Sequence, residues 1–398
     1  MINIVNPYTP GSGRIPSYLA GRDSIIEEAK RCIVSTQAQF PERSIAYYGL
    51  RGVGKTVLLN AIENIADDLN VLYEHIEIKE NNSFIKDVSI ASQRLLNQMS
   101  FKENAKDKLN KVIAAIKQLR VTINPADNTL SAEIADLTIP DSLSNDVTEL
   151  FVSLGKLAFD TGNTICFFID EIQYVEDEQL EALLMALHRV NQLRLPILVF
   201  CAGLPKILKT FGDIKSYSER LFQYTQIDSL KNNDAINAII EPAKPFNVKY
   251  TEDAIAEILL ATGCYPYFLQ ELCSTIWSIY DKNIIQKDDV ISAIPYSLEN
   301  LDNSFFQIRF ERCTETEREF MYAMVKCGEL PCTIANVARI MNRNVKSISP
   351  IRAQLINKGI VYSVKYKELD FTVPEFDGFI KRLEEYQTWD EKKKKNAT

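Results

Sequence analysis

The residues best suited to chemistry form a glycine-rich run, Gly49-Leu50-Arg51-Gly52-Val53-Gly54-Lys55-Thr56, which matches G-x-x-x-x-G-K-[ST] at every position. Glycines let successive backbone N–H groups point at phosphate oxygens, and a helix beginning near Lys55 would add the positive end of its dipole. The Lys55 ammonium would contact the β- and γ-phosphates of a nucleotide, and the Thr56 hydroxyl would bind Mg²⁺. The run therefore predicts a P-loop.

A pair of acids, Asp170 and Glu171, supplies the second half of the expected site. They follow the continuous apolar run 164–169, which is typical of a parallel strand covered on both faces. Open α/β sheets bind ligands at the carboxyl ends of their strands. We expect Asp170 to hold Mg²⁺, directly or through water, and Glu171 to orient and polarise an attacking water. The chain has no guanine-selecting N-K-x-D stretch, so ATP is the favoured nucleotide.

Alternating strands and helices must position these groups. Strands are predicted at 44–48, 70–78, 164–169, 195–203 and 223–228, with helices between them. This order indicates an α/β fold of the P-loop NTPase class with a parallel, doubly wound sheet. At 398 residues the chain is long enough for two or three domains. We expect a P-loop ATPase core at 1–228, a helical lid at 229–300, a winged helix-turn-helix at 301–380 and a basic tail at 381–398 that is frayed and solvated.

Residues 333–367 contain seven Lys and Arg side chains and no Asp or Glu, although the chain has a formal net charge of -8. Three expected helices and a two-stranded wing in this region have the layout that places one helix in the major groove of DNA. The third helix is expected to begin with Ser347 as its N-cap and to hold Pro350 in its first turn. The candidate contacts to double-stranded DNA are Lys346, Ser349, Arg352, Lys358, Lys365 and Lys367. The alternatives are a solvated surface and a module that packs against protein.

Four stretches in chain order, "GLRGVGKT", "FFIDEIQYV", "AGLPKILKTFGDIKSYSERLFQY" and "GCYPYFLQELC", resemble a known family. It comprises bacterial ATP-binding proteins related to origin-recognition-type AAA+ ATPases and to STAND signalling NTPases. The likeness runs from "NPYTPGSGRIPSYLAGRDSIIEEA" to "FTVPEFDGFI", which is nearly the whole chain.

The resemblance implies roles for three further residues. Arg22 belongs to a G-R-[DE] box whose backbone lies against adenine, Pro266 is implied to pack against the nucleotide, and Arg220 is similar to an arginine finger. Such a finger acts on a nucleotide bound by the next subunit of a homo-oligomer; a structural ion pair is the alternative for Arg220. The sequence departs from many AAA+ proteins at Cys201–Gly203, where a polar residue is usual, and it offers no sensor arginine in the lid. The resemblance thus implies slow hydrolysis and a molecular switch, with a signalling or scaffold ATPase as the alternative.

Composition narrows the class of protein further. No apolar run approaches the roughly 18 residues of a membrane span, and the N-terminus lacks the layout of a signal peptide, so we expect a cytoplasmic protein with no membrane partner. The eight cysteines are scattered and there are only two histidines, which argues against a zinc site or a histidine-based hydrolase. The insertion at about 80–160 suggests helices and a hairpin, and its sequence indicates no function.

Overall fold

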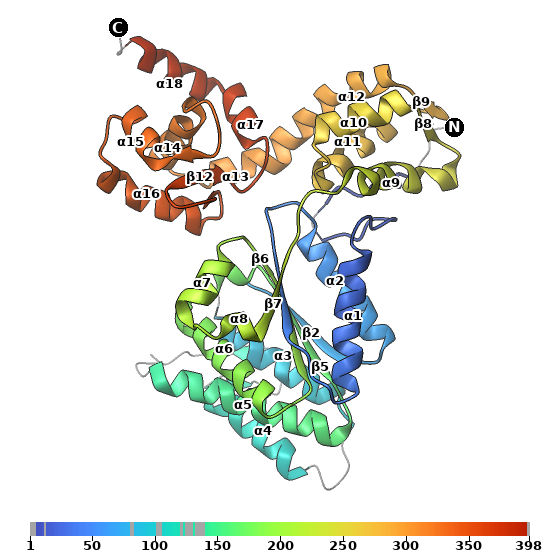
Figure 1. Ribbon diagram of the computed structural model, residues 1–398, viewed down its shortest axis with the longest axis vertical. Helices are drawn as coiled ribbons and strands as arrows, with labels where there is room; N and C mark the ends of the chain where they lie inside the picture. Colours follow the sequence, from blue (N-terminus) through green and yellow to red (C-terminus); the bar gives the residue numbers. More distant parts are fainter. Residues whose placement is uncertain are drawn as a thin grey trace.

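A computed structural model describes residues 5–11, 13–79, 83–100, 106–119, 122–123, 130–131 and 140–395 (Figure 1). Its centre is a parallel five-stranded sheet in the order β2-β5-β6-β1-β7. The strands are β1 (Ser44–Tyr48), β2 (Leu72–Glu77), β5 (Ile165–Asp170), β6 (Ile197–Gly203) and β7 (Phe222–Gln226). All five predicted strands are confirmed, with small shifts at their ends. The fold class predicted from the sequence, α/β with a parallel sheet, is confirmed as well.

Helices cover both faces of this sheet. α1 (Asp23–Gln37) and α2 (Lys55–Asp68) lie on one face, and α5 (Pro140–Thr161) and α6 (Asp177–Gln192) lie on the other (Figure 1). Successive side chains of a strand point to opposite faces, so Phe168 of β5 joins the core under α1 and α2 while Phe167 joins the core under α5 and α6. The remaining helical elements of the core are α3 (Phe84–Gln98), α4 (Lys106–Gln118), η2 (Ile172–Tyr174), α7 (Ile207–Ile214) and α8 (Ser218–Leu221).

The insertion expected at about 80–160 contributes α3, α4 and α5. Its predicted hairpin is present as two short antiparallel strands, β3 (Thr122–Ile123) and β4 (Leu130–Ser131), and the rest of that stretch lies outside the described residues. The insertion lies at the end of the core remote from the lid and C-terminal domain (Figure 1).

The lid is a helical layer at one end of the core. Its helices are α9 (Asn232–Ala243), α10 (Glu252–Thr262), α11 (Pro266–Ile279) and α12 (Lys287–Asn300), accompanied by η3 (Lys244–Phe246), β8 (Lys249–Tyr250) and β9 (Ile284–Ile285). The Thr251 hydroxyl accepts a hydrogen bond from the Ala254 N–H and caps α10, which ends at Gly263 in a left-handed conformation with φ 55°.

The C-terminal domain follows α12 through a π-helical turn, η4 (Leu301–Phe306), and α13 (Gln307–Glu311). Three helices come next, α14 (Glu315–Lys326), α15 (Ile334–Ile340) and α16 (Val345–Asn357). A hairpin of β11 (Val361–Ser363) and β12 (Glu368–Phe371) follows, and β10 (Cys332–Thr333) completes a sheet in the order β10-β12-β11. This is the element order expected for a winged helix.

Two details of this domain differ from expectation. Asn344, not Ser347, caps α16: its Oδ1 accepts the Ser347 N–H at 2.9 Å, and Pro350 therefore falls inside the helix instead of in its first turn. The basic tail expected at 381–398 contains the end of α17 (Phe376–Arg382) and all of α18 (Glu384–Lys395), so it is helical and not frayed as far as residue 395. Trp389 of α18 packs on Tyr322 of α14 with ring centroids 5.5 Å apart, and this apolar contact holds the helix against the domain. Lys392 is exposed, as expected.

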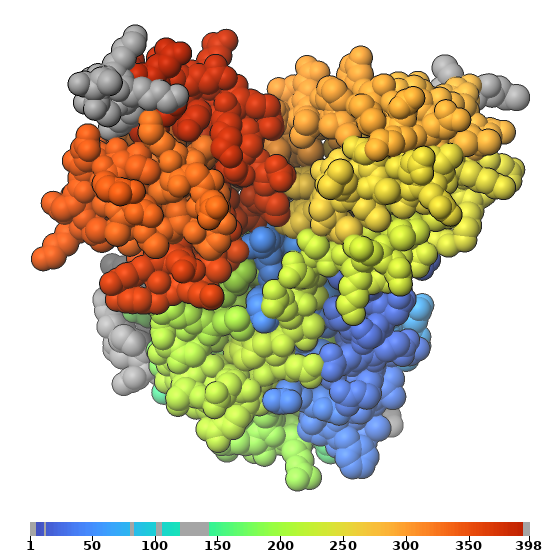
Figure 2. All heavy atoms as spheres, turned by 45° about the horizontal axis from the view of Figure 1, so that its top comes forward, coloured from blue at the N-terminus to red at the C-terminus, as the bar shows by residue number. Residues whose placement is uncertain are grey.

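The core, lid and C-terminal domain meet around one region (Figure 2). Aromatic side chains join the lid to the C-terminal domain. The ring of Phe305 in η4 stacks on that of Tyr267 in the lid with centroids 4.3 Å apart, and the ring of Phe306 stacks on that of Phe379 in α17 with centroids 5.4 Å apart. These rings belong to the same continuous apolar core as α2.

Candidate nucleotide site

The P-loop turns from β1 into α2 with a backbone that requires glycine. Gly52 and Gly54 have φ of 88° and 92°, a left-handed region that other residues rarely adopt. A Cβ on Gly49 would lie 2.1 Å from the Ile227 carbonyl oxygen. Gly54 is the N-cap of α2, and the first N–H groups of a helix have no partners within it. The loop is thus arranged to bind an anion.

Lys55 is folded back onto this loop. Its Nζ donates hydrogen bonds to the carbonyl oxygens of Gly49 at 2.9 Å and Leu50 at 2.7 Å. Burial lowers the pKa of the ammonium to about 8, against the opposing effect of the nearby carboxylates of Glu171 and Asp170. A phosphate would replace the two carbonyls as acceptor and stabilise the charged form of Lys55.

Asp170 ends β5 next to the first turn of α2. Its Oδ2 accepts a hydrogen bond from the Thr56 hydroxyl at 2.6 Å, and its Oδ1 accepts the Glu171 N–H at 2.8 Å. The residue is only 3% exposed, and burial raises the pKa of its carboxyl despite the opposing Thr56 hydrogen bond. Thr56 and Asp170 fit Mg²⁺, which prefers oxygen ligands and usually takes one or two carboxylates plus phosphates and waters. Within the described part of the chain, no cluster of three His, Cys, Asp or Glu side chains suits another metal site.

Glu171 follows in a left-handed backbone conformation with φ 54°, which is uncommon for a non-glycine residue. Its Oε1 accepts a hydrogen bond from Arg51 Nη1 at 3.3 Å, and its Oε2 accepts one from the Gln173 amide. The carboxylate therefore lies beside the P-loop with both oxygens engaged by side chains.

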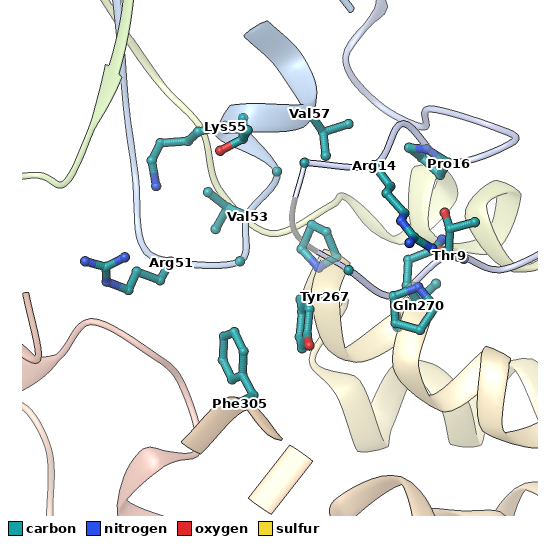
Figure 3. A pocket seen from close by; sticks show the side chains of 18 of the residues that line it. Thr9, Arg14, Pro16, Arg51, Val53, Lys55, Val57, Tyr267, Gln270 and Phe305 are labelled. Carbon is teal, nitrogen blue, oxygen red and sulfur yellow. The ribbon is translucent and has the colours of Figure 1, made fainter. Parts of the chain in front are cut away.

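A cavity of about 480 Å³ opens beside these groups. That volume is in the range of cofactor and small-ligand sites. Lys55 and Arg51 lie on one side of it, and Val57, Thr9 and Gln270 lie on the other (Figure 3). The lining also contains apolar side chains, Pro10, Leu19, Ala20, Val57, Leu230, Leu269 and the expected nucleotide contact Pro266. Arg14 lies beside Thr9 and Pro16 on the second side (Figure 3). The cavity thus combines cationic groups suited to phosphates with apolar side chains suited to a flat base.

Arg22 lines the same cavity, and its guanidinium braces the loop. Nη2 donates to the Val53 carbonyl at 3.1 Å and to the Asp228 carbonyl at 2.8 Å. Burial lowers its pKa, against the opposing carboxylates of Asp234 and Asp228. Arg22 therefore connects the entrance of α1, the P-loop and the end of β7.

Comparison with solved structures supports the same fold. The Walker-type ATPase PABY2304 of Pyrococcus abyssi superposes with a TM-score of 0.58 at 12% identity, covering 91% of this chain and 96% of that one. With the P-loop, the parallel sheet and the lid in place, the assignment follows. The chain has an α/β P-loop fold similar to that of this Walker-type ATPase.

Two further solved structures superpose with lower TM-scores, and one family model matches only the C-terminal domain. Aeropyrum pernix ORC1 in complex with DNA is similar with a TM-score of 0.46 at 13% identity, covering 94% of this chain and 95% of that chain. The Thermotoga maritima RuvB Holliday junction branch migration motor has a TM-score of 0.44 at 13% identity, covering 92% and 98%. Residues 303–380 match a family model described as a domain of unknown function (DUF8462). Among curated proteins, none matches the sequence significantly. None of the described helices has the length and apolar character needed to cross a membrane.

The expected DNA contacts are divided between two places in this P-loop fold. Lys346 and Ser349 are exposed on α16, and Lys365 and Lys367 are exposed at the tip of the hairpin beside Tyr366, which is 87% exposed. The Lys367 ammonium lies 4.8 Å from the centroid of the Tyr366 ring. These four candidates share an accessible surface.

The other two candidates are engaged within the domain. Arg352 donates a hydrogen bond to the Ser363 hydroxyl at 3.0 Å. Lys358 bonds to the buried Glu317 carboxylate at 2.7 Å and to the Arg312 carbonyl at 3.0 Å, and it lines the nucleotide cavity. Lys358 thus differs from our expectation of a cation directed toward DNA, because the C-terminal end of α16 is docked on the core.

Arg220 is exposed on α8 and is not among the described residues that line the cavity. Its position is compatible with contact to another subunit, and the single chain does not bring it to the P-loop.

Several residues at the cavity were not anticipated from the sequence. Arg51 was expected only as a member of the P-loop, and its side chain donates to Glu171, to the Tyr174 hydroxyl at 2.6 Å and to the Gly359 carbonyl at 3.3 Å. Arg309 and Arg312 of the α13 region also line the cavity. Burial and the neighbouring Arg51 lower the pKa of Arg309 to about 10. No local pattern reveals these contacts, because they join segments far apart in the sequence: Arg51 meets Glu171 and Tyr174 within the core and Gly359 of the C-terminal domain.

Proposed function

We propose that this protein is an ATP-binding, Mg²⁺-dependent and slowly hydrolysing AAA+/STAND-like molecular switch that couples its nucleotide state to DNA binding by a C-terminal winged helix. One observation is central to the proposal: Lys55, Thr56 and Glu171 line one cavity together with residues of the lid and the C-terminal domain, and Asp170 accepts the Thr56 hydrogen bond behind it. A ligand in that cavity would contact all three parts of the molecule.

The roles of the residues follow from their geometry. P-loop amides and Lys55 would bind the phosphates, Thr56 and Asp170 would hold Mg²⁺, and Glu171 would orient and polarise the attacking water. Mg²⁺, when bound, neutralises charge that develops on the phosphates. The base would occupy the apolar part of the cavity next to Pro266 and Arg22.

Slow turnover is supported by what surrounds Glu171. Its two carboxylate oxygens are engaged by Arg51 and Gln173, which reduces its freedom to hold a water. The end of β6 is Cys201–Gly203, which supplies no polar side chain there. A protein that retains ATP for long periods is better suited to act as a molecular switch than to turn over ATP continuously.

Arg220 is proposed to complete the site of a neighbouring copy. An arginine supplied in trans stabilises transition-state charge on the γ-phosphate. The test is ATP hydrolysis at increasing protein concentration: activity per subunit should rise with self-association, and Arg220→Ala should abolish that rise. A wild-type rate that is independent of concentration would contradict the role in trans.

DNA binding is proposed for Lys346, Ser349, Lys365 and Lys367. Three exposed cations that neutralise phosphates give a slope of about -2.7 for log K against log salt. The measurement is a mobility shift on double-stranded DNA over a salt series, with ADP and with a slowly hydrolysed ATP analogue. Salt-dependent binding that changes with nucleotide supports the proposal, and a flat salt response contradicts it.

A signalling or scaffold ATPase whose C-terminal domain binds protein is the second candidate function. The internal engagement of Arg352 and Lys358 favours it, because two of the six expected DNA contacts are already used within the chain. Oligomerisation on ATP without any DNA affinity in the same assay would support this candidate.

A further inference from the structure

Arg51 of the P-loop contacts the lid, the C-terminal domain and the neighbouring part of the core. Its carbonyl oxygen accepts a hydrogen bond from the Tyr265 hydroxyl of the lid, and its N–H donates to the Thr372 carbonyl at 3.1 Å. Its guanidinium reaches Glu171 and Tyr174 on the core and Gly359 on the C-terminal domain. The planar guanidinium presents several donors in a fixed arrangement, so one side chain can bridge these acceptors at the same time.

The C-terminal domain is shaped to approach Arg51 closely. Gly359 ends α16 with φ 65°, and a Cβ there would lie 2.9 Å from Arg51 Nη2 and 2.9 Å from Leu204 Cδ1. The Thr372 hydroxyl donates to the Gly359 carbonyl at 2.6 Å, which fixes that acceptor from within the domain. The left-handed backbone therefore favours glycine at this contact, and a side chain there would displace the ends of the Arg51 and Leu204 side chains.

The same guanidinium restrains Glu171. The pair is partly shielded, with 17% of the Arg51 and 27% of the Glu171 side chain exposed, and the charge-assisted hydrogen bond directs one carboxylate oxygen toward the P-loop arginine. Gln173 engages the other oxygen. A carboxylate bonded in this way is less available to accept a proton from water or to orient it.

We propose that Arg51 is a positioning residue that couples docking of the C-terminal domain to restraint of Glu171, so that the docked domain holds ATP hydrolysis down. Withdrawal of Gly359 and Thr372 removes two of the contacts that fix Arg51. Arg51 can then move away and release Oε1 of Glu171 to act on water, while Gln173 still engages Oε2. The inference rests on the proposed function, because it assigns Glu171 to hydrolysis.

The test compares Arg51→Ala and Arg51→Lys with the wild-type full-length chain under single-turnover conditions. Arg51→Ala should raise the hydrolysis rate at saturating Mg-ATP roughly fivefold or more, the lower range of typical allosteric couplings, and the dissociation constant for Mg-ATP is measured separately because Arg51 also lines the cavity. Arg51→Lys keeps the charge but cannot bridge the same acceptors, so its rate should also rise, by less. Arg31→Ala is the matched control, since it removes an arginine paired with Glu42 at 3.0 Å on the surface and should change neither value.

A second readout separates this inference from the proposed function. Small-angle X-ray scattering should give a larger radius of gyration for Arg51→Ala than for the wild type, whether or not ATP is hydrolysed. If the wild type and all variants bind ATP but hydrolyse no ATP, the proposed function fails. The scattering result then decides alone whether Arg51 holds the C-terminal domain in its docked position. A rate that falls or stays constant in Arg51→Ala, or an unchanged radius of gyration, overturns the coupling.

Discussion

The buried Lys55 ammonium leads to a prediction about proton uptake on nucleotide binding. In the free protein burial lowers its pKa to about 8 from the usual 10.5. Phosphate oxygens beside Nζ favour the charged form, so the pKa rises again when nucleotide binds. The free protein is therefore partly deprotonated above pH 8, whereas the complex is protonated, and binding takes up a proton in that range.

The expected size follows from the titration of one group. About nine in ten molecules carry the Lys55 proton at pH 7 and about one in ten at pH 9. Proton uptake should rise from about 0.1 per ATP at pH 7 to about 0.9 at pH 9, and affinity should fall about tenfold over the same interval. The sign is fixed: a lysine pKa that is low in the free state makes binding weaker as the pH rises.

Isothermal titration calorimetry with Mg-ATP measures this directly. Titrations in two buffers of different ionisation enthalpy give the number of protons taken up at each pH. Lys55→Arg is the control, because a guanidinium stays charged throughout and should show no uptake centred near pH 8, whatever its affinity. Uptake below about 0.2 at every pH, or an identical profile in the arginine variant, would refute the assignment of Lys55 to the phosphates.

Three further predictions test the site, the surface and the domain junction. Glu171→Gln should bind Mg-ATP normally, and its hydrolysis rate in a single-turnover assay should fall by a factor of about 10² or more. Normal hydrolysis would contradict the role of Glu171. Replacing Lys346, Lys365 and Lys367 together by alanine should reduce the salt slope of DNA binding from about -2.7 to near zero, and an unchanged slope in the mobility-shift series would move the contacts elsewhere. Phe306→Ala should lower the free energy of unfolding by about 3–5 kcal/mol, because the side chain is fully buried against Phe379; a loss under about 1 kcal/mol in urea unfolding would contradict its packing role.

The nucleotide site was predictable from sequence to the extent that its chemistry is local. The P-loop residues act through neighbouring backbone, and Asp170 follows its own apolar strand, so spacing alone located both. The strand order of the sheet then brought the Thr56 hydroxyl to within 2.6 Å of Asp170 Oδ2. Roles for these residues in binding and hydrolysis remain predictions.

What sequence did not reveal depends on contacts between distant segments. Arg51 and Gly359 are separated by most of the chain, and their meeting depends on how the C-terminal domain docks. Lys358 looked like a surface cation on α16, but packing of α16 on α14 pairs it with Glu317, and docking of the domain makes it part of the cavity lining. The N-cap of α16 was misplaced because Asn344 and Ser347 are both good caps, and the choice depends on which backbone N–H lies within reach.

The junction between lid and C-terminal domain indicates how nucleotide could control docking. The lid helix α12, the π-helical turn η4 and α13 follow one another without an intervening loop, and Phe305 within the turn both stacks on Tyr267 and lines the cavity. A ligand beside Phe305 therefore acts at the point where the two parts are joined. The aromatic contacts at this junction are apolar and extensive, whereas the contacts of Gly359 and Thr372 with Arg51 are few and polar. A movement of the lid would therefore shift the C-terminal domain with it and break the polar contacts to Arg51 first.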